Sequence, residues 1–282
     1  MEMDARAKRW KWRGRVMIGA LLGALVTGLL FGLSACEPGN GSTAYETGVM
    51  TEPEPTEIEP VVPRPTEIEP EPEPVVFCGL ANPEDAIILT DEEALSYLAL
   101  VNRCYRVSRE FEPNDLSVVD VESVNMNWGP HLMRESAARA LEDMFQAAAE
   151  EGLVLLARNG YRTHERQEMF HQNAIDRWGP EEGRRVSAVP GHSEHQLGLA
   201  MDITAHSVDA RLIEAFSVTP EGFWVSQNAH RFGFIISYPY GREQDTGFIY
   251  EPWHIRFVGV LAATEMFHTG QILEEFLWYH YE

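Results

Sequence analysis

Basic residues are scarce in this chain, and lysine is nearly absent. The 282 residues include 22 Lys or Arg and 44 Asp or Glu, which gives a formal net charge of −22 at pH 7. Lysine occurs only at positions 8 and 11, and residues 75–282 carry 32 acidic residues against 15 arginines, with no basic patch or stripe. Nucleic acid, which proteins bind largely through its phosphates, is therefore not an expected partner.

Cysteine is also rare, and its three positions exclude a cysteine-rich metal site. Neither Cys78 nor Cys104 has a second Cys or His at zinc-finger spacing, so we exclude both as ligands. If Cys36 carries a lipid and the chain is exported, as the N-terminus predicts below, these two residues remain as an even pair in an oxidising compartment. A Cys78–Cys104 disulfide would close a loop of about 26 residues and add about 3 kcal/mol. Two free buried thiols are the alternative.

The N-terminus predicts an export signal. Six Lys or Arg in residues 1–15 precede the apolar run VMIGALLGALVTGLLFGLSA, a pattern typical of such signals. The run leads into Leu33-Ser34-Ala35-Cys36, which resembles the bacterial lipobox, whose cysteine is acylated and becomes the mature N-terminus. We predict a lipoprotein signal peptide over residues 1–36 and a lipid anchor at Cys36 on the extracytoplasmic face of the cell membrane. Because the run is also long enough to span a bilayer, an uncleaved N-terminal anchor is the alternative.

Residues 37–74 predict a disordered acidic linker. Ten Glu and one Arg are interspersed with proline, and the sequence Pro-Thr-Glu-Ile-Glu-Pro occurs at 55–60 and again at 65–70. Frequent proline favours extended chain, and like charges extend it further. Such a segment cannot bury a core, so we expect a stiff spacer that reaches on the order of 100 Å. A linker without any specific reach is an equally good interpretation.

Residues 75–282 predict a single α+β domain, with a small, mostly antiparallel sheet flanked by helices. Thr90 and Glu93 form a capping-box pattern before a helix expected to run to about residue 102. Apolar spacing predicts further helices at 131–152, 163–179, 220–234 and 259–278. Strands are expected at 153–162, 195–203, 234–241 and 249–259.

Three side chains are candidates for holding one metal ion: His195, Asp202 and His254. Two imidazoles and a carboxylate with one open position are typical of a catalytic zinc site. Glu251, three residues before His254, is placed to take a proton from water near such an ion. In an undistorted strand these two side chains would point to opposite faces, so we expect Pro252 to bend the chain. The chain has ten His, and His192 with His195, or His164 with His171, are alternative pairs.

Three segments resemble the VanY-like D-alanyl-D-alanine carboxypeptidases. SEHQLGLAMD, in residues 193–202, matches that family's Ser-x-His-x-x-Gly-x-Ala-x-Asp pattern, and EPWHIRFVG, in residues 251–259, matches its Glu-x-x-His segment. NGYRTHERQ, in residues 159–167, is similar to its Gly-Tyr-Arg segment, and the order of the three agrees. The resemblance spans about residues 90–270 and implies an α+β fold with one zinc ion. His192 departs from the family pattern, where a small or hydroxyl residue is more usual, and is expected to line the cleft or to compete for the metal.

The resemblance also implies a role for each site residue. His195, Asp202 and His254 would be the zinc ligands, and Glu251 the catalytic acid and base. The residues that would contact substrate are Arg162, Gln167, Ser193 and Arg256. Arg162 would bind the substrate's terminal carboxylate, a task suited to a bidentate guanidinium, unless it forms only a surface ion pair with a nearby glutamate. A turn-stabilising hydroxyl is an alternative for Ser193, and Arg256 is expected either to support the ligands or to stabilise the oxyanion.

These expectations combine into one predicted function. The chain would be an exported, membrane-tethered zinc D-alanyl-D-alanine carboxypeptidase that removes the terminal D-alanine from peptidoglycan stem peptides by metal-activated water. A monomer is expected. Alternatives are an L,D-carboxypeptidase or an endopeptidase acting on the same substrate, and a non-catalytic lipoprotein that binds the cell wall.

Overall fold

The computed structural model describes residues 82–124 and 129–281. The predicted signal peptide, its lipobox residue Cys36, the acidic linker and Cys78 lie outside these residues. Cys104 forms a disulfide whose partner also lies outside the described residues. None of the helices within the described ranges is both long and apolar enough to cross a membrane.

A four-stranded antiparallel sheet is the centre of the domain and confirms the predicted α+β class. Its strands are β5 (Leu156–Asn159), β6 (Ala200–Thr204), β8 (His254–Phe257) and β7 (Phe234–Ile236), in that order. Every residue of β6 and β8 is buried, as expected for the two central strands. In their register Asp202 lies opposite His254, and Ala200 lies opposite Arg256.

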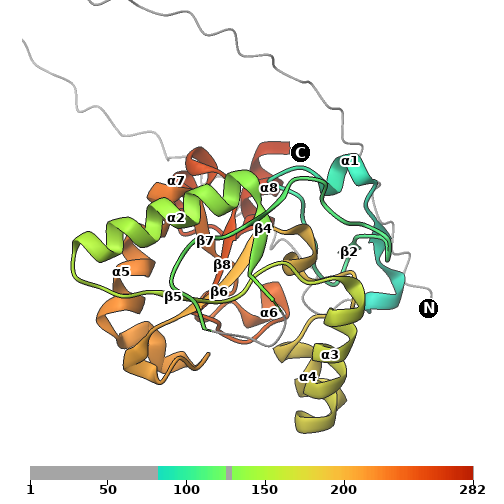
Figure 1. Ribbon diagram of the computed structural model, residues 1–282. Coiled ribbons are helices and arrows are strands. Elements are labelled where there is room, and N and C mark those ends of the chain that lie inside the picture. The colour runs from blue at the N-terminus through green and yellow to red at the C-terminus, as the bar shows by residue number, and fades with distance from the viewer. Residues whose placement is uncertain (1–81, 125–128, 282) are drawn as a thin grey trace, which may run out of the picture. The chain divides into compact units, whose positions relative to one another are not determined.

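Two smaller sheets flank this one. The strands β1 (Ile87–Ile88) and β2 (Tyr105–Arg106) pair in parallel, and β3 (Leu116–Val118) and β4 (Leu132–Arg134) pair antiparallel. The chain then passes from β4 directly into the long helix α2 (Glu135–Glu150; Figure 1). The buried apolar residues of α2 belong to the hydrophobic core. The predicted helix over 131–152 was therefore correct from residue 135 onward, but its first residues form a strand.

The remaining helices lie around the sheet. Helices α3 (His164–Trp178) and α4 (Pro180–Val186) pack side by side as a hairpin, and α3 begins at the predicted position with Thr163 as its N-cap (Figure 1). The other helices and turns of 3₁₀ helix are α5 (Pro220–Asn228), α6 (Glu243–Thr246), α7 (Val260–Thr269), α8 (Leu273–Tyr281), η2 (Pro83–Asp85), η3 (Glu194–Leu197), η4 (His206–Val208), η5 (Glu214–Val218) and η6 (Ala229–Phe232). The predicted single helix over 259–278 is two helices, because Gly270 between them adopts a positive φ of 72°.

The first predicted helix was wrong beyond its first turn. The Thr90–Glu93 capping box is present, but α1 (Asp91–Ala94) has only four residues. The carbonyls that would continue the helix accept hydrogen bonds from buried arginine side chains instead: Leu95 from Arg134, and Tyr97 and Ala99 from Arg256. Tertiary partners thus replace the helical ladder, which a local pattern cannot reveal.

The strand predicted over 195–203 begins only at Ala200. His195 lies instead in η3, which ends at Gly198 with a positive φ of 68°. A Cβ at Gly198 would lie 2.9 Å from Leu116 Cδ2 and 3.1 Å from Arg134 Cγ, so this turn requires glycine for both its conformation and its space. The turn separates His195 from the strand that carries Asp202.

Candidate metal centre and peptide pocket

Two of the three predicted ligands lie opposite each other on adjacent strands of the sheet. Asp202 on β6 and His254 on β8 are direct neighbours in the antiparallel register, and His254 Nδ1 lies 3.1 Å from Asp202 Oδ1. Residues opposite each other in an antiparallel pair project to the same face. The sheet register therefore brings together two residues that are 52 positions apart in the chain.

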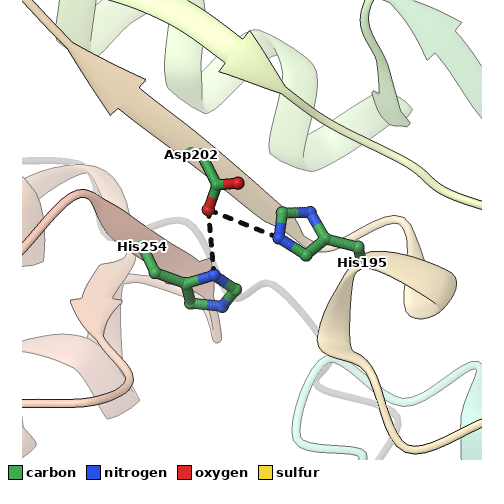
Figure 2. A group of neighbouring side chains, drawn as sticks. All are labelled: His195, Asp202 and His254. Atoms are coloured by element: carbon green, nitrogen blue, oxygen red, sulfur yellow. Dashed lines mark hydrogen bonds and ion pairs between the residues drawn. The ribbon is translucent and has the colours of Figure 1, made fainter. Parts of the chain in front are cut away.

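The third ligand arrives from the turn before β6. His195 Nε2 lies 3.4 Å from the same oxygen, Asp202 Oδ1, and Figure 2 shows the three side chains converging on one point. One ligand atom from each residue lies within 4.8 Å of the others, and all three residues are buried. The predicted triad is thus assembled from η3, β6 and β8.

The backbone sets the orientation of His195. Its Nδ1 lies 2.9 Å from the carbonyl oxygen of Gly160, which can only accept a hydrogen bond, so Nδ1 carries the proton and Nε2 is left with a lone pair toward Asp202. Burial, with the positive charge of Arg162, lowers the pKa of His195 to about 4. The imidazole is therefore neutral at pH 7, which is the form that binds a metal.

His254 is oriented by a residue that the sequence analysis did not select, Glu194. His254 Nε2 lies 2.9 Å from Glu194 Oε2, so this nitrogen donates to the carboxylate and Nδ1 faces the triad. Burial lowers the pKa of His254, but hydrogen bonds to Asp202 and Glu194 outweigh it and raise the pKa to about 10. Glu194 also accepts hydrogen bonds from Ser237 at 2.7 Å and from Arg256 at 3.0 Å. A carboxylate that holds the outer nitrogen of a ligating histidine is a common second-layer arrangement around metals.

The second oxygen of Asp202 is held from the opposite side. Asp202 Oδ2 accepts hydrogen bonds of 2.8 Å from both Asn159 Nδ2 and Arg162 Nη2. Burial alone would raise the pKa of Asp202, but His195, His254 and Arg162 hold it well below its usual range. The carboxylate is therefore ionised, with Oδ1 directed to the triad. Asn159 is a second residue that sequence reasoning missed.

Glu251 lies beside the triad without joining it. Its Oε2 is 3.9 Å from His254 Nδ1. The bend expected at Pro252 is a turn: His254 donates its backbone N–H to the carbonyl of Glu251, and β8 begins only at His254. Both side chains reach one pocket because Glu251 precedes the strand. Burial, with the negative charges of Asp202 and Glu194, raises the pKa of Glu251 to about 8.

These groups lie in a pocket of about 400 Å³. Of the predicted substrate contacts, Arg162, Gln167 and Ser193 line it together with all three ligands and Glu251. Arg162 is nine-tenths buried, donates from Nη1 to Gln167 Oε1 at 3.2 Å, and lies over the ring of Phe170. One wall is the face of α3 that carries Gln167, Phe170 and Ala174. The pocket is thus continuous from the metal triad to α3.

Comparison with known proteins identifies the family. The family model for VanY, the D-alanyl-D-alanine carboxypeptidases, matches residues 130–260. A D-alanyl-D-alanine carboxypeptidase of Enterococcus faecalis is 33% identical over 210 residues, which cover 70% of this chain and 72% of that protein. This chain belongs to the VanY family of D-alanyl-D-alanine carboxypeptidases. YodJ of Bacillus subtilis, named as a carboxypeptidase, is 44% identical over 180 residues, which cover 64% of this chain and 66% of YodJ.

Solved structures agree with the VanY assignment. The LdcB LD-carboxypeptidase superposes with a TM-score of 0.64 at 40% identity, covering 68% of this chain and 90% of LdcB. VanYB in complex with D-alanine-D-alanine gives a TM-score of 0.54 at 33% identity, covering 65% of this chain and 98% of VanYB. A VanY variant in complex with Zn(II) gives 0.53 at 32% identity, covering 64% of this chain and 98% of that one.

The donor set of this VanY-family domain fits zinc. It offers two imidazole nitrogens and one carboxylate oxygen, a donor set of the kind found in catalytic zinc sites, and each has an outer partner that fixes its direction. Within the described ranges this triad is the only such grouping of three His, Cys, Asp or Glu residues. The chain is thus of the zinc carboxypeptidase type, a hydrolase acting on peptide bonds.

Two predictions about neighbouring residues need correction. Arg256 is fully buried and does not line the pocket; it donates to Glu194 and to the carbonyls of Tyr97 and Ala99. Because Glu194 holds the ligand His254, Arg256 matches the alternative in which it supports the ligands, and the predicted contact with substrate was wrong. His192 neither lines the cleft nor competes for metal, because it is buried with Nδ1 2.6 Å from the carbonyl of Asn102.

The alternative histidine pairs are also excluded within the described residues. His171 Nδ1 lies 2.9 Å from the carbonyl oxygen of Ser187, and neither His164 nor His171 belongs to the metal grouping. Glu194 is the one acidic residue in the run 191–200, all of which is buried. The sequence shows only an acidic residue next to His195, and its burial becomes visible in the structure. A buried charge needs partners, so such a position predicts a supporting network.

Proposed function

We propose that this chain is an exported, membrane-tethered zinc carboxypeptidase that removes the terminal D-alanine from peptidoglycan stem peptides. The observation that carries the proposal is the convergence of His195, Asp202, His254 and Glu251 in one pocket that also contains Arg162. Membership of the VanY family supports the reaction class. Export and tethering are inferred from the signal-like N-terminus and the lipobox-like segment ending at Cys36.

Glu251 is the group that moves protons. Bound zinc polarises the scissile carbonyl and makes water more acidic. Glu251 is buried beside the ligands without ligating, and without zinc its pKa is raised to about 8. The positive charge of a zinc ion held by the triad would lower this pKa and favour the carboxylate, which is the form that accepts a proton from water. Glu251 takes the proton from the attacking water and later delivers a proton to the nitrogen of the departing D-alanine.

Arg162 positions the substrate by its terminal carboxylate. Only one N–H on each Nη is used by Asp202 and Gln167, and Nε donates to no described residue although it is buried. An arginine has five N–H donors in a rigid fork, so donors remain for an anion in the pocket. Gln167 fixes the guanidinium, because its own amide is held by Ser187 Oγ at 3.2 Å and by the Ala188 carbonyl at 2.8 Å. The preference for a free C-terminus makes the enzyme an exopeptidase.

The bond that is cut distinguishes two candidates. The family description and the Enterococcus faecalis relative favour the bond between two D-alanines of a pentapeptide stem. A second candidate is the L,D bond of a tetrapeptide stem, because the LdcB LD-carboxypeptidase matches with higher identity and TM-score than VanYB. Both reactions release D-alanine and use the same pocket.

One incubation separates these candidates. The zinc-loaded protein is mixed with pentapeptide stems, tetrapeptide stems and cross-linked dimers, and product masses are followed with the Glu251→Gln variant as control. Loss of one D-alanine from the pentapeptide supports the D,D candidate, loss from the tetrapeptide supports the L,D candidate, and cleavage of the dimer indicates an endopeptidase. If no stem is cut by protein that holds one zinc ion, the proposed function is wrong.

The anchor is tested separately. In a bacterial host, the full chain is expected in the membrane fraction with a lipid mass on the peptide that begins at Cys36, and the Cys36→Ala variant is expected to lose that lipid. A retained peptide from residues 1–35 in the wild-type protein would contradict acylation and favour the uncleaved anchor.

A further inference from the structure

Asn159 is held against the metal triad by an irregularity in the sheet. In the β5–β6 pairing Ala157 lies opposite Ile203, and a regular antiparallel ladder would then place Asn159 opposite Met201. The register shifts between Ala157 and Asn159, so that Asn159 instead lies opposite Asp202. Because neighbouring positions face opposite sides of a sheet, this one-residue shift moves Asn159 from the core side of Met201 to the pocket side. Bulges that re-aim a side chain are frequent next to active sites.

The chemistry of the amide determines which of its atoms faces Asp202. An ionised carboxylate only accepts hydrogen bonds, so the atom of Asn159 that lies 2.8 Å from Asp202 Oδ2 must be the NH₂ group. The carbonyl oxygen, Asn159 Oδ1, is therefore the atom left over. It is buried and accepts a hydrogen bond from none of the described residues, and Asn159 lines the pocket.

We infer that Asn159 has two roles: its NH₂ group positions Asp202 for the metal, and its Oδ1 accepts a hydrogen bond from a backbone N–H of the bound peptide. The second role rests on the proposed function. With Arg162, the NH₂ group occupies Asp202 Oδ2 and leaves Oδ1 as the single oxygen toward His195 and His254. A buried acceptor without a donor costs free energy, and a peptide entering the pocket carries the N–H groups that remove this cost.

The positioning role is tested by zinc affinity, which needs no turnover. Asn159→Leu keeps the size of the side chain and removes its polar atoms. Competition with a chromogenic chelator is expected to give a zinc Kd raised about tenfold or more, in the range found for lost outer partners of metal ligands. The matched control is Asn173→Leu, the same change on the exposed wall of the pocket, which should leave zinc affinity within about twofold. Equal affinities for Asn159→Leu and wild type would overturn this role. If the Leu variant does not fold, Asn159→Ser, too short to reach Asp202, replaces it.

The acceptor role is tested by a double-mutant cycle with the substrate. In a zinc-loaded Glu251→Gln background, calorimetry compares a pentapeptide with two analogues, each with an ester oxygen in place of one of its last two backbone N–H groups. In the protein that keeps Asn159, one analogue should bind about fivefold to tenfold more weakly than the peptide, as expected for the loss of one hydrogen bond. In the Asn159→Leu protein, that analogue and the peptide should bind equally well. If each analogue loses the same affinity relative to the peptide whether residue 159 is Asn or Leu, the inference is overturned. Failure of the unmodified peptide to bind at all would instead refute the proposed function, and the zinc measurement would still decide the first role.

Discussion

Glu194 should contribute about 3 kcal/mol to the stability of the zinc-free protein, and Glu194→Gln tests this value. The substitution keeps the shape and the hydrogen bonds to Ser237 and His254 but removes the charge opposite fully buried Arg256. Burial opposes ionisation of Glu194, yet Arg256 and His254 lower its pKa from 4.5 to about 2. At about 1.4 kcal/mol per pKa unit, this shift corresponds to roughly 3 kcal/mol at pH 7. Removing one partner of a buried ion pair independently gives about 3–5 kcal/mol.

The measurement is urea unfolding of the zinc-free protein at several pH values. Because the folded pKa lies below the unfolded one, the stabilisation is fully present above about pH 4.5 and is lost as the pH falls toward 2. The difference between wild type and Glu194→Gln should therefore be largest at pH 7 and shrink below pH 4.5. Glu151→Gln, at the exposed end of α2, is the control and should change stability by less than about 0.5 kcal/mol. A loss below about 1 kcal/mol at pH 7, or one that does not change with pH, would refute the assigned ion pair.

Three further outcomes are expected. Because burial raises the pKa of Glu251 from 4.5 to about 8, the zinc-free folded state keeps a proton there that the unfolded chain releases, and stability should fall with rising pH between these values. Glu251→Gln should therefore gain about 4 kcal/mol at pH 8 in urea unfolding of the zinc-free protein, while abolishing hydrolysis. Wild-type enzyme should prefer a stem peptide with a free C-terminus to its amide by about 10- to 100-fold in kcat/KM, and Arg162→Gln should lose that preference; an unchanged preference would contradict its role. Gly160→Ala should cost about 2 kcal/mol in thermal unfolding, because its Cβ would lie 2.4 Å from the carbonyl oxygen of Leu132, whereas Gly152→Ala, in open space, should cost about half as much for its positive φ.

The site was more predictable from the sequence than the path of the chain. The ligand types, their order and Glu251 follow from the family-like segments, and the structure brings all four together. The helix predicted after Thr90 failed because the carbonyls of Tyr97 and Ala99 bind Arg256, more than 150 residues away in the chain. Such a partner leaves no trace in a local hydrophobic pattern.

The supporting residues were harder to predict for a similar reason. Asn159 falls inside the strand predicted over 153–162, but its role depends on a register shift that no residue type signals. Arg256 follows His254 by two and so shares its face of β8, which left open whether it would support the ligands or stabilise the oxyanion. Ala200, the small residue opposite Arg256, leaves room there for its side chain to reach Glu194. The alternation of side chains along a strand correctly predicted the face of β8 on which Arg256 lies, but it could not predict that Arg256 binds Glu194.

The three buried carboxylates of the site have different pKa values, and they also differ in the hydrogen-bond donors and charges around them. Glu194 accepts from Ser237, His254 and Arg256, and its pKa is lowered to about 2. Asp202 receives two donors on Oδ2, and the adjacent His195 and His254, together with Arg162, hold its pKa well below its usual range.

Glu251 accepts no side-chain hydrogen bond from any of the described residues, and burial raises its pKa to about 8. Asp202 and Glu194, whose pKa values are low, stay ionised at neutral pH. Asp202 can therefore ligate the metal, and Glu194 can hold His254 in place, without either exchanging protons. Without zinc only Glu251 of the three has a pKa near neutral pH, and the charge of a bound zinc ion would lower that pKa toward the carboxylate form that accepts a proton. Burial is common to all three, so the arginines and hydrogen bonds around each carboxylate, rather than its depth in the protein, determine which one acts as the base.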